Sequence, residues 1–223
     1  MSTPTESHAF QPAGPSSSRS PCPALNSLAN HGYLNRDGRA ITVPELVRAM
    51  NEVYHVSVPL GSILATVGAV WCGSGWSLDL EDLAAHNKIE HDASLTHDDA
   101  RATDKYAPIP PNPELVKQFL AVTGKSYLTL DDLVKYRAQR DGTLSRPLSS
   151  VHNIIAVGEL ALTQQAFENV EGHLSKEYLH AWYGEEKLPA GWGVPQGKVL
   201  GLLSTSKLNK RIQDAVAKIE KSK

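Results

Sequence analysis

The chain has 223 residues, 41% of them hydrophobic, so we expect one domain with enough apolar side chains for a sizeable core. Its 22 Lys and Arg and 24 Asp and Glu give a net charge of −2, which excludes the strongly basic surface of a nucleic-acid binder. With two cysteines, Cys22 and Cys72, the chain cannot form a disulfide-rich scaffold, a zinc site of four cysteines or a cysteine-ligated iron–sulfur cluster.

The N-terminal segment differs in composition from the rest of the chain. Residues 1–20 are rich in Ser and Pro, and we expect a flexible arm before a domain of residues 21–223. No signal peptide or Asn-x-Ser/Thr acceptor is apparent, which leaves an intracellular protein or a mature secreted form as alternatives. The longest apolar run, 63–72, is too short to cross a bilayer.

The remaining pattern predicts an all-α fold of roughly eight to ten helices, because we find no convincing strand alternation and no internal repeat. Pro23 suits the first position of a helix, and Thr42 with Glu45 forms a capping pattern. Further helical segments are expected, in chain order, at 59–72, 78–86, 113–122, 130–140, 149–168 and 175–183, with a last helix carrying the stripe Leu208, Ile212, Val216 and Ile219.

Glu159 is the most informative residue from physical reasoning alone. It is the only charge within residues 154–162, and a helix would place it on one face with Ile155 and Leu162. Burial in such apolar surroundings raises the pKa of a carboxyl group, which makes Glu159 a candidate general acid or base. A buried glutamate paired with an unidentified cation is the structural alternative.

Cys22 lies between two prolines at the expected start of a helix. The helix dipole and the free N–H groups at that position stabilise a thiolate, which is a good ligand for a soft metal or for haem iron. An exposed structural thiol in a turn remains the alternative.

A third candidate is the segment Glu90-His91-Asp92-Ala93-Ser94. Glu90 and Ser94 offer hard oxygen ligands suited to Mg²⁺, and Asp92 can hold the His91 imidazole in one tautomer. Acidic loops are usually just solvated, and we interpret the following His97, Asp98 and Asp99 as a solvated helix start.

The order of these three sites resembles one known family. The run from Pro21-Cys22-Pro23 to His31-Gly32-Tyr33, followed by Asp37-Gly38-Arg39, is similar to the proximal segment of the haem-thiolate peroxidases, which include chloroperoxidases and peroxygenases. The Glu-His-Asp-x-Ser segment resembles their second motif, and Glu159 stands where they keep a distal acid. The resemblance covers about residues 20–195, and His91 places the chain with the shorter peroxygenases.

The resemblance implies specific roles. Cys22 would be the axial ligand of haem b, and Glu159 would move the proton of an iron-bound peroxide, which forms compound I. His91 would hydrogen-bond Glu159 and be held by Asp92. Glu90, the His91 carbonyl and Ser94 would hold a Mg²⁺ beside a haem propionate.

The implied activity is hydrogen peroxide-dependent oxygenation of small apolar or aromatic molecules, with peroxidase oxidation as a side activity. We expect a mainly aliphatic pocket, because the chain has only three Phe. The candidate lining residues by family position are Leu60, Ile63, Leu64, Ile155 and Leu162. Longer peroxygenases have an Arg where this chain has His152, for which we favour a surface or core role, and we expect Cys72 to be a buried free thiol.

Several alternatives stay open. Within the enzyme class, the chain could be a halide-oxidising protein similar to chloroperoxidase. Outside it, a non-haem helical scaffold with a metal loop at 90–99, or a partner-binding helical module, fits the bare composition. A monomer and a homodimer are equally compatible with the sequence.

Overall fold

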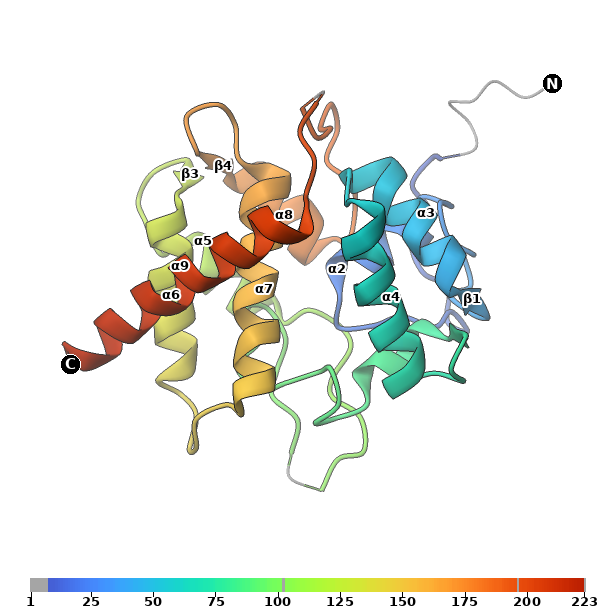
Figure 1. Ribbon diagram of the computed structural model, residues 1–223, viewed down its shortest axis with the longest axis horizontal. Helices are drawn as coiled ribbons and strands as arrows, with labels where there is room; N and C mark the ends of the chain where they lie inside the picture. The colour runs from blue at the N-terminus through green and yellow to red at the C-terminus, as the bar shows by residue number, and fades with distance from the viewer. Residues whose placement is uncertain (1–7, 102, 196, 223) are drawn as a thin grey trace.

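The computed structural model describes residues 8–101, 103–195 and 197–222. These residues form eight α-helices and one 3₁₀ helix, which confirms the all-α prediction (Figure 1). The helices are α2 (Pro23–Asn30), α3 (Val43–Tyr54), α4 (Val58–Trp71), η1 (Leu80–Ala84), α5 (Pro113–Leu120), α6 (Leu130–Asp141), α7 (Ser150–Phe167), α8 (Lys176–Gly184) and α9 (Leu202–Lys221).

Local sequence signals set several of the helix starts. Pro23 is the first residue of α2, where its missing N–H costs no hydrogen bond. The Glu45 carboxylate accepts hydrogen bonds from the Thr42 backbone N–H at 2.8 Å and from its hydroxyl at 2.6 Å, which completes the predicted cap of α3. Asp132 caps Thr129 at the start of α6 in the same way.

Two small antiparallel ribbons accompany the helices, although the sequence predicts no strands. β1 (Ile41–Thr42) pairs with β2 (Ser77–Leu78), and β3 (Tyr127–Leu128) pairs with β4 (Leu174–Ser175). Each strand has two residues, which is too short to show an alternating pattern of side chains.

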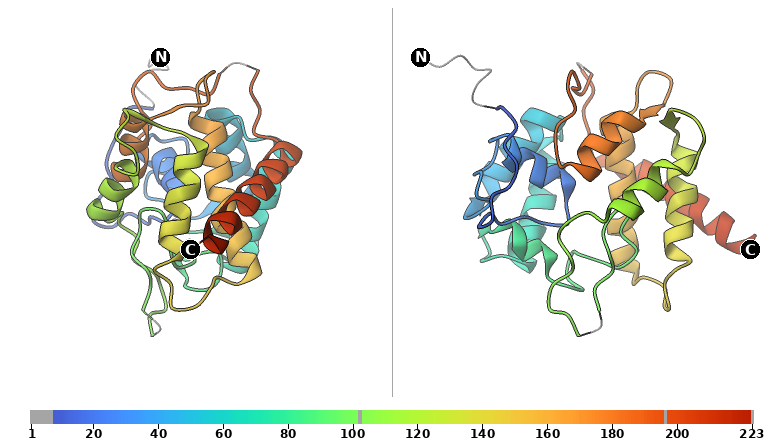
Figure 2. Two further views of the ribbon diagram at one scale, coloured as in Figure 1. Left: turned by 90° about the vertical axis from the view of Figure 1, so that its left-hand side faces the viewer. Right: turned by 180° about the vertical axis from the view of Figure 1, so that it is seen from behind.

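The helices form two groups with α2 between them (Figures 1 and 2). In one group α3 packs on α4, and in the other α9 packs on α7 and α6, while α5 packs on α8. α4 and α7 both contribute to the wall of a central cavity. No helix in the described part of the chain is long and apolar enough to cross a membrane.

Parts of the N-terminal segment that the structure describes pack against the domain, which differs from the expected flexible arm. The His8 ring stacks on Tyr33 with centroids 3.8 Å apart. Ser18, Arg19 and Ser20 are buried, and the Arg19 guanidinium donates two hydrogen bonds to the Asn30 side-chain oxygen, at 2.6 and 3.1 Å. This packing depends on partners distant in the sequence, which composition cannot reveal. The expected arm at residues 1–7 lies outside the described residues.

Candidate active site

A central cavity brings together residues of all three predicted sites. Its walls come from the start of α2, from α3 and α4, from the loop at 89–97, and from α7 and α8. Most lining side chains are apolar, but Cys22, Glu90, Ser94 and Glu159 also line it. A second hollow, at α5 and α8, is lined by no cysteine or carboxylate, so the central cavity is the candidate active site.

Cys22 is the N-cap residue of α2, and its side chain makes no cap hydrogen bond, although the nearby backbone N–H groups of Leu25 and Ala24 lower the pKa of its thiol. Burial nevertheless raises the pKa of the Cys22 thiol to about 11, because the two amides only partly offset the loss of solvation. The helix N-terminus alone therefore does not produce the thiolate that the sequence predicts. A bound cation would be needed to deprotonate this sulfur.

A buried polar network that the sequence analysis missed fixes the backbone around Cys22. The Cys22 N–H donates to the Ser20 hydroxyl at 3.2 Å, and the Ser20 hydroxyl donates to the Asn26 side-chain oxygen at 3.1 Å. The Asn26 amide nitrogen donates to the Ser20 carbonyl at 2.7 Å and to a Glu186 carboxylate oxygen at 2.5 Å. The sequence did not predict this network, because short polar side chains are common around a proline-flanked turn.

Glu159 projects from α7 into the cavity. Although it lies deep in the protein, 44% of its side-chain surface is accessible, because that surface faces the cavity. The predicted rise in its pKa is wrong. Burial does raise the pKa of Glu159, but the charge and contact of His91, followed by Arg137 and His97, lower it below its ordinary value overall.

His91 is the close partner of this carboxylate. Its Nε2 lies 3.6 Å from Glu159 Oε1, which is an ion-pair contact slightly longer than a hydrogen bond. Burial lowers the pKa of His91, but the Glu159 carboxylate and the Asp92 carbonyl more than offset this effect, and the pKa is raised overall. Each of the two side chains therefore favours the charged form of the other, and of the two Glu159 lines the cavity.

Asp92 holds His91, as expected, but it does so through its backbone carbonyl and not through its carboxylate. The His91 Nδ1 donates to the Asp92 carbonyl oxygen at 2.8 Å, which directs Nε2 toward Glu159. One oxygen of the Asp92 carboxylate is buried and has no hydrogen-bond partner among the described residues.

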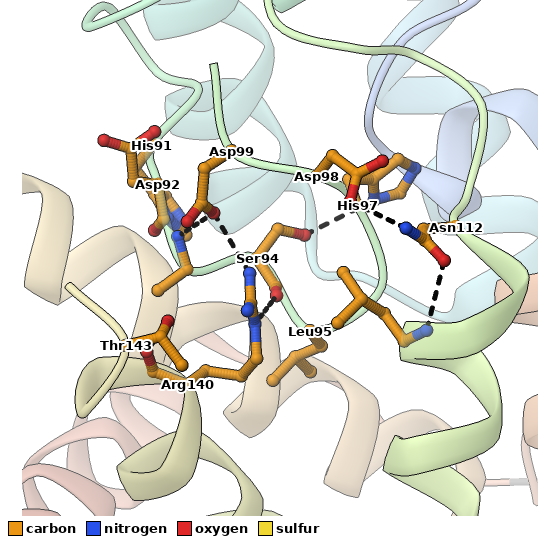
Figure 3. A network of polar contacts seen from close by, with 12 residues as sticks. His91, Asp92, Ser94, Leu95, His97, Asp98, Asp99, Asn112, Arg140 and Thr143 are labelled. Carbon is orange, nitrogen blue, oxygen red and sulfur yellow. Dashed lines mark hydrogen bonds and ion pairs between the residues drawn. The ribbon is translucent and has the colours of Figure 1, made fainter. Parts of the chain in front are cut away.

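Two arginines of α6 clamp the loop that carries these groups, and the sequence analysis did not identify them. Arg137, fully buried, donates to the Ala93 carbonyl at 2.8 Å and pairs with Asp141. Arg140 donates to the Ser94 carbonyl at 2.7 Å (Figure 3). Because both carbonyls are held, Ala93 keeps a left-handed backbone with φ of +58°.

A carboxylate inside the loop completes this clamp (Figure 3). Asp99 accepts a hydrogen bond from the Ala93 N–H at 2.7 Å and from Arg140 at 3.0 Å. Arginine is usually exposed, so the sequence alone did not predict that two arginines of α6 would hold this loop.

His97 differs from the predicted solvated helix start. The segment is a loop, and the His97 side chain is buried in the cavity wall. Burial lowers the pKa of His97 to about 4, so the ring is neutral near pH 7. Its Nδ1 lies 3.3 Å from the Ser94 hydroxyl (Figure 3), and its Nε2 has no partner among the described residues. Asp98 and Asp99 are exposed, as the prediction required.

The structure adds two donors, His86 and the Asp92 carboxylate, to the expected cation ligands. Glu90 and Ser94 both line the cavity. The Glu90 carboxylate is 2.8 Å from His86 Nδ1; burial raises its pKa and His86 opposes that rise. One ligand atom from each of His86, Glu90 and Asp92 lies within 4.8 Å of the others, so His86 and the Asp92 carboxylate join the candidate donors.

Of the five residues proposed for the pocket lining, Leu64 and Leu162 line the cavity. Leu60 is buried, Ile155 is half-buried and Ile63 is exposed, and none of these three is among the lining residues. The lining is mainly aliphatic, with three aromatic residues that the sequence analysis did not single out: Tyr54, Trp182 and Tyr183.

Two residues left open by the sequence lie near the site. The His152 ring is 6.4 Å from the His91 ring, and its Nε2 lies 3.1 Å from the Lys88 carbonyl oxygen. Cys72 is a free, half-buried thiol in a separate surface hollow, which His86 also lines.

Comparisons with known proteins agree with the arrangement of these motifs. The model of the family "Peroxidase, family 2" matches residues 8–197. The chain is 29% identical to a chloroperoxidase of Leptoxyphium fumago over 82% of this chain and 56% of the relative. An aromatic peroxygenase of Coprinellus radians is 32% identical over 45% of each chain.

A third relative is the dothistromin biosynthesis peroxidase dotB of Dothistroma septosporum, which is 33% identical over 44% of this chain and 28% of its own length. The chain thus spans between about a quarter and just over half of the length of these relatives.

Proposed function

Because the chain belongs to the haem-thiolate peroxidases, peroxidase family 2, we propose that it is a peroxygenase. It would use hydrogen peroxide to oxygenate small apolar or aromatic molecules, with peroxidase oxidation as a side activity. One observation carries this proposal: a single, mostly apolar cavity has in its walls the Cys22 thiol, at a helix N-terminus, and the Glu159 carboxylate, which pairs with the buried His91.

Haem b is the cofactor that the family implies, and the residues present are suited to it. The Cys22 sulfur borders an apolar cavity at a helix N-terminus, close to the backbone N–H groups of Leu25 and Ala24, which suits a thiolate ligand of iron. Bound haem would supply the redox-active iron, and thiolate ligation favours cleavage of the peroxide O–O bond. Cys22 would be the axial ligand, held in place by the network of Ser20, Asn26 and Glu186.

Glu159 would handle the proton of hydrogen peroxide. Its lowered pKa keeps the carboxylate ionised near neutral pH, so it can accept a proton from a peroxide oxygen in the cavity and return it to an oxygen that leaves. His91 supports this role as a cation, because its positive charge stabilises the carboxylate before the proton arrives.

A Mg²⁺ ion is also part of the proposal. Glu90, the His91 carbonyl and Ser94 would bind it through oxygen atoms, which Mg²⁺ prefers. The buried Asp92 oxygen that lacks a hydrogen-bond partner supports a nearby cation, since an unpaired carboxylate is costly to bury. The ion would offset the negative charge of Glu90 and Asp92.

Substrates would bind through burial rather than through polar recognition. Aliphatic side chains make up most of the cavity wall, including Leu64 and Leu162, and Tyr54 and Trp182 add aromatic surface. The Tyr54 hydroxyl already interacts with Ser27 and with the Trp182 indole N–H, so these two rings present mainly carbon to the cavity. This composition favours small apolar and aromatic molecules.

A halide-oxidising enzyme is the second candidate, because the chloroperoxidase relative covers the largest share of this chain among the three relatives described. Turnover of chloride or bromide compared with an aromatic substrate, at equal peroxide, would separate the two activities.

The visible spectrum tests the proposal directly. Protein expressed with sufficient haem should show, after reduction and exposure to CO, the strongly red-shifted Soret band of thiolate-ligated haem. A colourless protein, or a CO spectrum typical of histidine ligation, would contradict the proposal and favour a non-haem helical scaffold or interaction module.

A further inference from the structure

The outer surface of α4 has an unusual composition for an exposed helix. None of its 14 residues is charged. Its exposed large apolar side chains are Val58, Ile63, Leu64, Val70 and Trp71. A helix that is apolar all round is normally buried against a neighbour, so this surface is expected to have a partner.

Two other helices extend this apolar surface. Nine of the thirteen exposed large apolar side chains in the described residues belong to α4, α7 and α9. The start of α9 lies against the start of α4, because the Ser57 N–H donates to the Leu200 carbonyl at 3.0 Å. Leu202 and Leu203 follow at once, and Leu203 is 76% exposed. Figure 1 and both views of Figure 2 place α4 and α9 on the same side of the molecule.

We call this surface the α4–α9 face, defined by the exposed residues of α4 and α9. Positive charge accompanies it. α9 has five cationic residues and two acidic residues, on a chain whose net charge is −2. All five cations are exposed: Lys207, Lys210, Arg211, Lys218 and Lys221.

We propose that the α4–α9 face binds the surface of an anionic lipid bilayer. Its apolar side chains would enter the boundary between headgroups and acyl chains, and the cations of α9 would lie against lipid phosphates. Trp71 at the end of α4 and Trp76 in the following loop, which is 63% exposed, are of the type enriched at membrane interfaces.

The charge of α9 favours a lipid surface over a second copy of this chain. In a symmetric dimer through the α4–α9 face, the same cationic helix would approach its copy, and like charges would repel. An anionic bilayer offers both the apolar layer and the opposite charge that this face requires.

The location of the α4–α9 face indicates what lipid binding would contribute to activity, an argument that rests on the proposed peroxygenase function. Leu64 is exposed on α4 and also lines the cavity. An apolar substrate dissolved in the bilayer would therefore meet the α4–α9 face at a helix that also forms part of the cavity wall. The substrate class would then be membrane-dissolved apolar molecules.

Vesicle binding tests the proposal. Haem-loaded protein is sedimented with vesicles of phosphatidylcholine alone or of phosphatidylcholine with phosphatidylglycerol, and tryptophan emission is recorded. We expect binding to the anionic vesicles, weakened by salt, with a blue shift of the emission. The double variant Lys207→Glu/Arg211→Glu should bind at least about tenfold more weakly, because each cation near an anionic surface contributes on the order of 1 kcal/mol.

A matched control has the same change of charge away from the face. Lys117→Glu/Lys125→Glu alters two exposed cations at α5 and the loop after it, and should bind like the unchanged protein. Trp71→Ser should lose most of the blue shift.

Three results would overturn the proposal. The first is equal binding to neutral and anionic vesicles, and the second is an equal loss of vesicle binding in the control variant. The third is that the unchanged protein forms a dimer and that Lys207→Glu/Arg211→Glu dissociates it. None of these depends on the Soret spectrum, so failure of lipid binding and failure of the proposed function are distinguishable.

Discussion

The Nε2 atom of His91, on an irregular loop, lies 3.6 Å from Oε1 of Glu159, on the longest helix of the cavity wall. The pKa of His91 is raised and that of Glu159 is lowered, so each group keeps the other charged. A carboxylate held ionised at a cavity wall can accept a proton at once, which is the property a general base requires.

Replacing Glu159 by Gln should slow the reaction with peroxide by about 10²- to 10⁴-fold, because the amide cannot accept the proton. The size of the side chain is unchanged, so haem content should stay close to that of the parent, while loss of the pair with His91 should lower the melting temperature slightly. Stopped-flow spectroscopy of the haem band measures the rate. Glu171→Gln, at an exposed position, is the control, and an undiminished rate in Glu159→Gln would mean that another group moves the proton.

The charged pair should also give the haem-free protein a defined pH dependence of stability. The raised pKa of His91 contributes stability that is complete below the ordinary value of 6.5 and is lost as the pH rises through the higher folded value. The lowered pKa of Glu159 contributes stability that is present above the ordinary value of 4.5 and is lost as the pH falls through the lower folded value.

The contribution of the pair should therefore be largest between about pH 4.5 and 6.5. Urea unfolding of protein stripped of divalent cations, compared with His91→Ala across pH, measures it. The difference between the two proteins should narrow on both sides of that range. A difference that does not change with pH would indicate that His91 only fills space.

Cys22→Ser should abolish the thiolate signature in the CO spectrum, because the sulfur is removed. The fold should stay intact, because serine is close in size to cysteine and is a good N-cap residue. In the haem-free parent, the pKa of about 11 leaves the Cys22 thiol almost entirely protonated at neutral pH. Cys22 should therefore react slowly with a thiol reagent, and faster as the pH rises toward 11. Rapid labelling of Cys22 at pH 7, identified by mass spectrometry against Cys72→Ser, would contradict this placement.

Removal of the proposed Mg²⁺ should lower the thermal stability of the protein, because the negative charges of Glu90 and Asp92 would then repel each other. Glu90→Gln and Ser94→Ala should each weaken Mg²⁺ binding in calorimetric titration. His86→Ala separates the two donor sets. It should leave the affinity unchanged if the oxygen atoms of Glu90, His91 and Ser94 suffice, and should weaken binding if His86 is itself a ligand.

The helices could be predicted because their signals are local. Thr42 and Glu45 are three residues apart, and Pro23 fixes its own backbone, so neither depends on the rest of the fold. The candidate site was harder. Cys22 and Glu159 could be proposed for one site only through the family resemblance, since nothing in their spacing brings them to one cavity.

Properties set by long-range neighbours could not be predicted. The pKa of Glu159 was expected to rise because its neighbours in the sequence are apolar, whereas His91 and Arg137, from two other segments, lower it. His97 was expected in solvent because two aspartates follow it, yet the loop buries it in the cavity wall. In each case the decisive contact joins residues far apart in the chain.

The clamp on the 90–99 loop gives the last prediction. Arg137 is fully buried and holds both the Ala93 carbonyl and the half-buried Asp141, so Arg137→Gln leaves the Asp141 carboxylate without its cation. Breaking a fully buried pair costs about 3–5 kcal/mol, and because Asp141 keeps some contact with solvent we expect a smaller loss in urea unfolding. Arg137→Gln/Asp141→Asn should recover part of the stability, because no buried charge is then left unpaired.

The Ala93 carbonyl would still lack its donor in that double variant, and this separates loop positioning from overall stability. If Arg137 positions His91, the double variant should keep a slowed reaction with peroxide at a temperature where it is fully folded. Arg140→Gln, which frees the neighbouring Ser94 carbonyl, should slow the reaction similarly. A double variant with the parent's peroxide rate would show that the loop holds His91 in place without Arg137.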